Sequence, residues 1–455
     1  MNDSTQHYSP RAALAAVGVK MQQLHLFEPI AKQVNIRQKT VKHTPAQKLY
    51  DAFISLLAGA EGLVEINKRV RSDPALQHAF GRNACAEQSV VQETLDACTQ
   101  ENVLQMQAAI GQIYRRHSRG FRHDYPEHLQ LLDADLTGLP CGKKCEFASK
   151  GYFAHQRHRR GRQLGRVLAT RYDEIVAEHL YEGKTQLPTA FRGLVEAAEQ
   201  VLELDEKKRS RTVLRVDSGG GNINDINWAL ERGYLYHGKD YSGMRARCLA
   251  KGVREWVEDP KTPGRQVGWI EEAPNPYTRP VRRIAVRCRK NNGQWGVGVL
   301  VSALSPEEVI VQTRQPIHRA KDPTAVVLAY VYFYDARGGG VETSNKEDKQ
   351  GLGLGKRNKK RFAAQEMLVL LAALAHNVIV WARAWLSALC PPLSRLGIVR
   401  MVRDVFTTSG WLRMDASGHV QQIALNEHDS LAPRLVAALR AGLAQHHIAI
   451  NLGQT

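Results

Sequence analysis

The chain is 455 residues long and contains 63 lysines and arginines against 45 aspartates and glutamates, which gives a formal net charge of +18. This length exceeds one ordinary hydrophobic core, so we expect two to four domains of roughly 100 to 200 residues each. The positive charge favours a polyanion such as nucleic acid as the partner, although a merely soluble or ribosome-associated basic protein would share it. The seven scattered cysteines indicate a reducing compartment and argue against a disulfide scaffold.

The first part of the chain divides into a polar lead-in and a helical segment. Residues 1–45 are basic and have no continuous apolar leader, so we expect a loosely ordered lead-in without a signal peptide, and a cytoplasmic protein. Apolar residues recur at helical spacing from 46 to about 120, which predicts an all-helical domain. Its residues 89–106 suggest a helix-turn-helix reader with a capping box at Ser89 and Gln92, although an ordinary helical bundle is the simpler interpretation.

From about residue 121 to 233 the pattern changes to that of an α/β segment. Residues 129–140 predict a buried strand on which Asp133 and Asp135, two positions apart, point to one face. Residues 145–153 and 163–170 predict neighbouring strands joined by a very basic loop. A helix at 194–204 and a strand at 212–221, with Asp217 near its end, follow.

The rest of the chain is first strand-rich and then helical. Short apolar runs between 234 and 330, separated by Pro, Gly and Asn, predict a β-rich insertion, and we expect the run AVVLAYVYFY at 325–334 to belong to this pattern. Helix should return from about residue 360. The apolar stretch 367–389 is interrupted by His376, Asn377 and Arg383, each costly in lipid, so a buried core helix is preferred to a membrane span.

Three acids at predicted element ends form a candidate site. Asp135, Asp217 and Glu342 are separated by 81 and 124 residues, and Glu342 stands in a strongly basic segment. Three carboxylates can hold two divalent cations about 4 Å apart for phosphodiester chemistry. Oxygen ligands favour Mg²⁺ or Mn²⁺ over zinc. Each acid alone has a plainer interpretation, as a turn residue, a cap or a solvated helix residue.

Local motifs around these acids strengthen the hypothesis. They are Asp-x-Thr at Asp135, the run RVDSGGG containing Asp217, and a Tyr-x2-Arg…Glu-x6-Lys signature formed by Tyr334, Arg337, Glu342 and Lys349. The segment AHNVIVWARAW follows. Over about residues 125–390 these blocks resemble the DDE transposases of the IS4 superfamily, in particular its IS1380-like group.

The resemblance implies a mixed α/β fold. A ribonuclease H-like catalytic core would be built from 121–233 and 331–390 and interrupted by the β-rich insertion 234–330. The helical domain 46–120 would bind DNA, and 391–455 would form a C-terminal extension. It further implies cut-and-paste transposition of a bacterial insertion sequence, by a nucleoid-associated protein that assembles as a homodimer on its terminal inverted repeats and target DNA.

By the same resemblance, Asp135 would bridge two Mg²⁺ or Mn²⁺ ions, and Asp217 and Glu342 would each complete one ion's shell. Tyr334, Arg337 and Lys349 would hold phosphate and end bases near the cut. Arginine suits this role because it grips phosphate bidentately. A metal-dependent nuclease of the same fold without strand transfer, and an inactive transposase-derived DNA-binding protein, remain the alternatives.

One spacing departs from the family pattern. Four residues, Gly338 to Val341, separate Arg337 from Glu342 where the family has three. A run of glycines can absorb an extra residue as a bulge. Glu347 is therefore the alternative to Glu342, and Asp133 is the alternative to Asp135, with the Asp-x-Thr context favouring Asp135.

Three other segments of the chain contain residues typical of ligand binding. The run GLGLGKRNKK lacks the glycine and the hydroxyl residue that a phosphate loop needs. Zinc ligation by a Cys-x3-Cys-x9-His-x2-His set is a further possibility, although the histidines stand in a basic loop suited to phosphates; the set is Cys141, Cys145, His155 and His158. We expect a basic patch to follow the DNA backbone, or else to be a solvated surface; it consists of Lys346, Lys349, Lys356, Arg357, Lys359, Lys360 and Arg361.

Overall fold

The computed structural model describes residues 5–39, 42–153, 156, 158–240, 242–271, 273–290, 292–444 and 448–454. The chain folds into two compact units. Unit 1 consists of Met1–Ser118, Gly138–Arg162 and Ser344–Thr455, and unit 2 of Arg119–Thr137 and Gln163–Thr343. Unit 1 therefore combines segments from both ends of the chain, which differs from the expected succession of domains.

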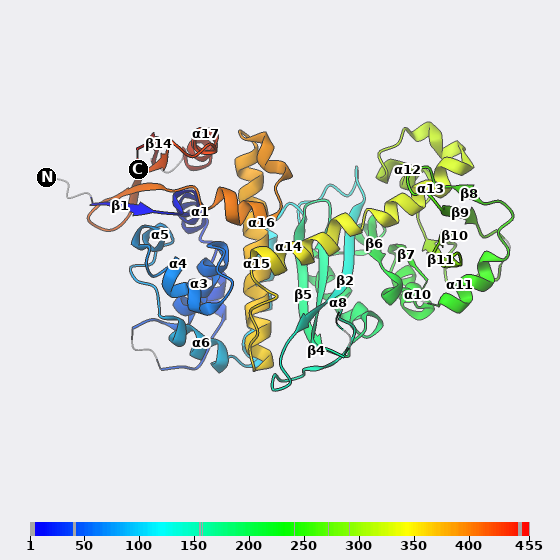
Figure 1. Ribbon diagram of the computed structural model, residues 1–455, viewed down its shortest axis with the longest axis horizontal. Helices are drawn as coiled ribbons and strands as arrows, with labels where there is room; N and C mark the ends of the chain where they lie inside the picture. The colour runs from blue at the N-terminus through cyan, green and yellow to red at the C-terminus, as the bar shows by residue number, and fades with distance from the viewer. Residues whose placement is uncertain are drawn as a thin grey trace. The chain divides into compact units, whose positions relative to one another are not determined.

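Unit 1 is mainly helical, and its longest helix, α15, is a core helix (Figure 1). Helices α3, α6 and α7 pack against α15. The helix is long and apolar enough to cross a membrane, but its most apolar window is 89% buried. The helices are α1 (Ala12–Gln23), α2 (Glu28–Gln33), α3 (Pro45–Leu57), α4 (Ile66–Arg69), α5 (Pro74–Ala79), α6 (Gln88–Ala97), α7 (Gln100–His117), α14 (Thr343–Gly351), α15 (Phe362–Ser387), α16 (Ile398–Arg400) and α17 (Ala432–Leu443), with short turns at Leu63–Glu65, Pro391–Arg395 and Met401–Val405.

The polar residues of α15 are satisfied inside unit 1. His376 Nδ1 lies 2.8 Å from Asp348 Oδ1, and both side chains are fully buried. Asn377 is also buried. The interrupted apolar run is therefore that of a helix with polar partners in a protein core.

A small sheet in unit 1 joins the two ends of the chain, in the order β1 (Thr5–Ser9), β12 (Gly410–Met414), β13 (Val420–Asn426) and β14 (Ala449–Gly453). Strand β14 is parallel to β13, and the other pairs are antiparallel. Helix α1 is almost entirely buried. The expectation of a loosely ordered lead-in over residues 1–45 is therefore wrong for the described residues, because its alanine-rich apolar run forms a core helix.

Unit 2 is built on one long sheet. From β4 onward its strands run in the order β4–β2–β6–β7–β11–β10–β9–β8, and β5 also pairs with β4. Strands β2, β6 and β7 are mutually parallel, whereas β7 to β11 and the strands beyond pair antiparallel. The bounds are β2 (Gln130–Pro140), β4 (Arg160–Ala169), β5 (Glu174–Glu182), β6 (Thr212–Val216), β7 (Leu235–Lys239), β8 (Val257–Glu258), β9 (Arg265–Trp269), β10 (Arg282–Arg289) and β11 (Trp295–Ser302).

Helices of unit 2 cover this sheet. They are α8 (Leu187–Leu202), α9 (Glu206–Arg209), α10 (Ile223–Glu231), α11 (Gly243–Ala250), α12 (Pro306–Gln312) and α13 (Pro323–Asp335), with a 3₁₀ turn at Ile317–Lys321. Helix α8 packs on β5, α10 on β7, and α13 on β9, β10 and β11 (Figure 1). The apolar side chains of α13 complete a core with Val267, Ile284 and Leu300.

Several local predictions are corrected by these elements. The run at 325–334, expected as strand, is helix α13, capped by Asp322 Oδ1, which accepts hydrogen bonds from the Thr324 and Ala325 amides. Only β3 (Ser149–Lys150) forms within the strand expected at 145–153, and it pairs with the first residues of β4. Helix α6 begins at Gln88, so Ser89 is not its cap, and the capping box lies instead at Thr99 and Asn102 of α7.

Candidate active site

The register of two parallel strands brings the two aspartates together. Strand β2 pairs with β6 so that Ala134 lies opposite Val216. Asp135 follows Ala134 on β2 and Asp217 directly follows the last residue of β6, so the two aspartates neighbour one another at the carboxyl end of β6. Asp217 is fixed in its turn because its Oδ1 accepts a 2.8 Å hydrogen bond from the Gly219 amide.

The third acid is delivered by the segment that follows α13. Arg337 stands two residues beyond the end of α13, and residues Gly338–Glu342 form a π-helical turn. The hydroxyl of Thr343 donates a 2.9 Å hydrogen bond to the Gly338 carbonyl across this turn. Four residues lie between Arg337 and Glu342, and the π turn accommodates the additional one.

All three acids converge on the guanidinium of Arg337. Its nitrogens lie 4.0 Å from Asp135 Oδ1, 3.8 Å from Asp217 Oδ2 and 3.1 Å from Glu342 Oε1. Arg337 is only 4% exposed, whereas the exposed fraction rises from 14% for Asp135 to 39% for Asp217 and 56% for Glu342. The cluster is therefore anchored inside unit 2 and opens to solvent on the side of Glu342.

The ionisable groups of this cluster shift one another's pKa values. Burial raises the pKa of Asp135 to about 7, and Asp217 and Glu342 add to the rise while Arg337 opposes it. Burial alone would lower the pKa of Arg337, but Asp135, Asp217 and the other neighbours raise it. Burial also raises the pKa of Tyr334 to about 12. Each carboxylate therefore disfavours ionisation of its neighbours, and the guanidinium favours it.

Asp133, the alternative to Asp135, belongs to a separate structural pair. Its carboxylate receives two hydrogen bonds from Arg215, at 2.7 and 2.8 Å, and one from Thr170 at 2.7 Å. Arg215 also donates to the carbonyl of Phe333 at the end of α13. Asp133 is fully buried and its carboxylate is engaged by Arg215 and Thr170, so Asp135, and not Asp133, belongs to the cluster around Arg337.

The glycine run is required by this packing at one position. A Cβ on Gly340 would lie 2.6 Å from Asp133 Oδ2 and 2.8 Å from Thr170 Cγ2, whereas a Cβ on Gly339 would meet nothing within 4 Å. Gly340 also has non-helical backbone angles, φ −95° and ψ −109°. The π turn can therefore lie close to the Asp133 pair only because residue 340 has no side chain.

Glu347, the alternative to Glu342, has a different partner. It lies in unit 1, where its Oε2 accepts a 2.7 Å hydrogen bond from the Val399 amide and the carboxylate packs over Gly397. Glu342 is instead within ion-pair distance of Arg337 in unit 2. This difference in partners favours Glu342 as the third acid.

The donor chemistry of the cluster fits a divalent cation. Carboxylate oxygens are the ligands that Mg²⁺ and Mn²⁺ prefer, and three carboxylates meet around Arg337. Among the described residues, no three His, Cys, Asp or Glu side chains are arranged as ligands of a single metal ion. The structure therefore shows acids gathered around the Arg337 guanidinium rather than a formed set of metal ligands.

The basic residues expected to contact DNA differ in exposure. Lys349 lies on α14 and is partly buried, and Lys356 is exposed and ion-pairs with Glu61 in unit 1. Arg357 is only 2% exposed and donates to the carbonyls of Leu352 and Ala60. Lys359 is also buried. The expectation that Arg357 and Lys359 lie in an exposed basic patch is wrong, because both are enclosed by the fold.

The cysteine and histidine set shows no metal site in the part that can be described. Burial raises the pKa of Cys141 to about 11, and the neighbouring Cys145 contributes to that rise. His158 is exposed, and His155 lies outside the described residues. Within the described residues, Cys141, Cys145 and His158 do not form a metal-ligating group.

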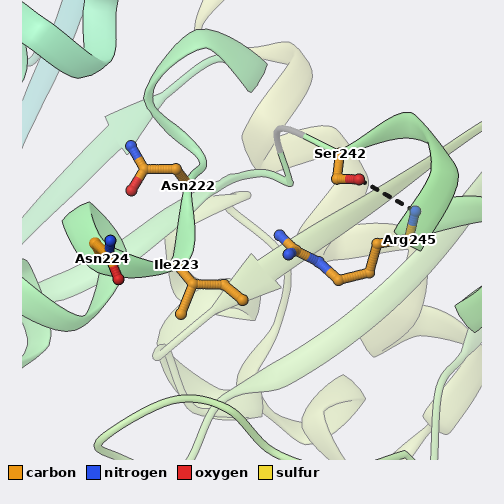
Figure 2. Close-up of a pocket in the computed structure, with 5 residues that line it drawn as sticks. All are labelled: Asn222, Ile223, Asn224, Ser242 and Arg245. Atoms are coloured by element: carbon orange, nitrogen blue, oxygen red, sulfur yellow. Dashed lines mark hydrogen bonds between the residues drawn. The ribbon is translucent and has the colours of Figure 1, made fainter.

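A small pocket follows the neighbouring strand ends in unit 2. It has a volume of about 150 Å³ and is lined by Asn222, Ile223, Asn224, Ser242 and Arg245. Figure 2 shows the guanidinium of Arg245 reaching between the two loops, and Ser242 Oγ accepting a 3.2 Å hydrogen bond from the Arg245 amide. Asp240 holds this guanidinium at 2.6 and 2.8 Å. Sequence patterns alone did not single out Arg245 or Arg215, although Arg215 is conspicuous as a cation within the apolar strand TVLRV.

The fold and the site define a mixed α/β protein in which three sequence-distant acids surround one arginine. Among solved structures, the chain is similar in fold to a piggyBac transposase, determined by cryo-electron microscopy as a synaptic complex with hairpin DNA. The similarity covers 96% of this chain and 84% of that chain, at 10% sequence identity and a TM-score of 0.48. No family model and no curated protein sequence matches the chain. A similarity this weak does not assign an activity, which depends on the residues of the site.

Proposed function

We propose that the chain is a DNA transposase that cleaves and joins phosphodiester bonds at the cluster of Asp135, Asp217 and Glu342. The supporting observation is the convergence of these acids, from three distant parts of the sequence, within 4.0 Å of the Arg337 guanidinium. The sequence motifs around the same residues resemble those of DDE transposases. The net charge of +18 suits a DNA partner.

Asp135, Asp217 and Glu342 would hold two Mg²⁺ or Mn²⁺ ions. Such ions activate a water or a hydroxyl and stabilise the leaving oxygen of a phosphodiester. Attack on phosphorus breaks the bond to the 3′ oxygen, which takes up a proton and becomes a free 3′-hydroxyl beside a 5′-phosphate. The same site would direct that hydroxyl at a second phosphodiester, so that the number of phosphodiester bonds is conserved in the joining step.

Arg337 and Tyr334 would position the phosphate. A guanidinium can donate two parallel hydrogen bonds to phosphate oxygens, and a phenol can donate one more. The raised pKa of Tyr334 keeps its hydroxyl protonated at neutral pH and therefore able to donate. Terminal inverted repeats would be the cleaved DNA, in a complex bridged by two copies of the chain.

The test uses purified full-length protein, Mg²⁺ or Mn²⁺, and labelled DNA carrying the sequences that flank the gene. We expect end-specific cleavage and joined products from the wild type and neither from Asp217→Asn or Glu342→Gln. Glu347→Gln is the matched control and should retain activity. Cleavage by both active-site variants at the wild-type rate would refute the site.

The remaining outcomes separate the two other functions. Cleavage without joined products would replace the transposase with a nuclease of the same fold. Binding to end-bearing DNA without cleavage, at any divalent ion concentration, would identify a DNA-binding protein derived from a transposase.

A further inference from the structure

A second and larger pocket lies wholly within unit 1, beside the C-terminal end of α3. Its volume is about 360 Å³, and the residues that line it include Ala58, Glu61, Arg69, Gln350, Arg403 and Thr407. Small-molecule sites commonly have volumes of about 300 to 1,000 Å³. The pocket is therefore large enough for a compact ligand that carries a phosphate.

Cations concentrate around this pocket from four parts of the chain. Arg69 and Arg403 line it. Arg11 Nε and Arg69 Nη1 both donate to the carbonyl of the lining residue Ala58, at 3.3 and 3.4 Å. Arg357 donates to the carbonyl of Ala60, two residues further on. Arg11, Arg69 and Arg357 thus meet at the carbonyls of Ala58 and Ala60, just after the end of α3.

Acids do not match this number of cations. Glu65 pairs with Arg69 at 2.7 Å. Glu61 is shared between Lys356 and Arg403, with the Arg403 nitrogen 4.0 Å away. Within the described part of the chain, neither Arg11 nor Arg357 has an ion pair with a carboxylate.

Arg357 carries the least satisfied group of the cluster. It is 2% exposed, and its Nη1 is buried without a hydrogen-bond partner among the described residues. Burial lowers the pKa of Arg357 to about 10, and Arg69 lowers it further while Glu65 and Glu61 oppose the shift. A buried donor without an acceptor is costly. The group that this arginine cluster lacks is therefore a hydrogen-bond acceptor, and its surplus of cations favours an acceptor that carries negative charge.

We propose that this pocket binds a phosphate group, held directly by Arg69 and Arg403 and attracted by the surrounding Arg11, Lys356 and Arg357. Guanidinium groups bind phosphate oxygens through two parallel hydrogen bonds, which suits a pocket with an arginine on each of two chain segments. The phosphate comes either from a small phosphorylated molecule or from the DNA backbone. The proposal uses no residue of the acid cluster in unit 2 and does not depend on catalysis.

The test compares two neighbouring arginines in the full-length chain. Arg403 lines the pocket and is 58% exposed, whereas Arg400 does not line it, is 64% exposed and pairs with Asp404. Arg403→Gln and Arg400→Gln therefore remove the same charge from similarly exposed positions of one segment. Circular dichroism and thermal unfolding without ligand check that both variants fold.

Two probes distinguish the sources of the phosphate. Inorganic phosphate and AMP are titrated by calorimetry at constant ionic strength, and a short DNA duplex by fluorescence anisotropy over a range of salt concentrations. For a small-molecule site, phosphate or AMP binds the wild type, Arg403→Gln weakens binding at least about fivefold, and Arg400→Gln has no comparable effect. For a DNA site, neither small probe binds, and Arg403→Gln alone reduces the salt dependence of duplex binding by about one ion.

Either result supports a phosphate site at this pocket. Equal effects of the two substitutions would overturn the proposal, because they would indicate diffuse surface charge. Absence of binding by all three probes would also overturn it and would leave Arg11 and Arg69 as caps of the last carbonyls of α3.

Discussion

The guanidinium of Arg337 lies 3.1 Å from the carboxylate of Glu342 across a single π-helical turn. The same guanidinium is within ion-pair distance of Asp135 and Asp217. Arg337 is thus a counter-charge shared by all three acids. This places it in competition with any divalent ion for the same carboxylates.

Removal of this counter-charge should strengthen metal binding while it impairs cleavage. Two unit charges 4 Å apart interact by about 4 kcal/mol at an effective dielectric constant of 20. Relief of only part of the repulsion between the Arg337 guanidinium and a divalent ion would therefore change the affinity for that ion about tenfold. We expect Arg337→Gln to bind Mn²⁺ about tenfold more tightly by calorimetry and to lose most cleavage. Arg337→Lys retains the charge and is the control. Unchanged or weaker Mn²⁺ binding by the Gln variant would contradict this role.

The two neighbouring aspartates of β2 should respond differently to substitution. Asp133→Asn leaves the buried Arg215 without its charge partner, and loss of one member of a buried pair typically costs about 3–5 kcal/mol. Asp135→Asn should abolish cleavage without a comparable loss of stability at pH 7.5. Urea unfolding and cleavage assays on both variants measure the two effects. Wild-type stability together with lost cleavage for Asp133→Asn would instead make Asp133 a catalytic residue.

Asp135 should make stability fall as the pH rises. Its pKa is raised from 3.8 to about 7 in the folded chain, so the folded chain binds more protons than the unfolded chain between these values. The stabilising contribution is complete below the unfolded pKa and is lost as the pH passes through 7. Each pKa unit corresponds to about 1.4 kcal/mol. As the pH rises, we therefore expect the free energy of unfolding of the wild type to fall by roughly 2–4 kcal/mol relative to that of Asp135→Asn.

The measurement is urea unfolding of the wild type and Asp135→Asn from pH 4 to pH 8 in the presence of EDTA. Asp124→Asn changes an exposed acid of the same unit and should follow the wild type. Parallel pH profiles for the wild type and Asp135→Asn would show that this carboxyl is not perturbed.

The glycine run offers a direct steric test. An alanine at 340 would place its Cβ 2.6 Å from Asp133 Oδ2, and overpacking of this kind typically costs about 1–3 kcal/mol. We expect Gly340→Ala to be destabilised in urea and slow in cleavage. Gly339→Ala has open space around its Cβ and should leave the stability in urea and the cleavage rate nearly unchanged. Similar behaviour of the two variants would show that the close approach at residue 340 is unimportant.

The three acids singled out from the sequence meet around Arg337, whereas one of the elements near them was predicted wrongly. Asp217 follows the apolar strand β6, Asp135 lies within β2 rather than at the expected strand end, and parallel pairing of β2 and β6 is enough to make the two aspartates neighbours. The strand expected at 325–334 failed because α13 is buried on most sides and therefore shows no polar period. Asp322 and Pro323, as cap and first residue, were the helix signals at its start.

Long-range partners explain the remaining differences. The role of Asp133 depends on its register with Arg215, which no local pattern reveals. Arg357 lies in a glycine-rich basic run typical of a surface, yet it is buried because its guanidinium reaches carbonyls just after α14 and just after α3. Likewise, β1 pairs with β12, which lies about 400 residues later in the chain. The polar composition of the N-terminal segment alone could therefore not predict that it forms an ordered strand.

The turn at Gly338–Glu342 also affects how related chains should be aligned. On a regular α-helix, side chains four residues apart lie on the same face, whereas π-helical hydrogen bonds link residues five apart. Here the backbone leaves helical geometry at Gly340, and Arg337 and Glu342, separated by four residues, still meet at 3.1 Å. An inserted amino acid at such a kink alters the count along the sequence without separating the two side chains, so equivalent residues are better identified by their contacts than by their spacing.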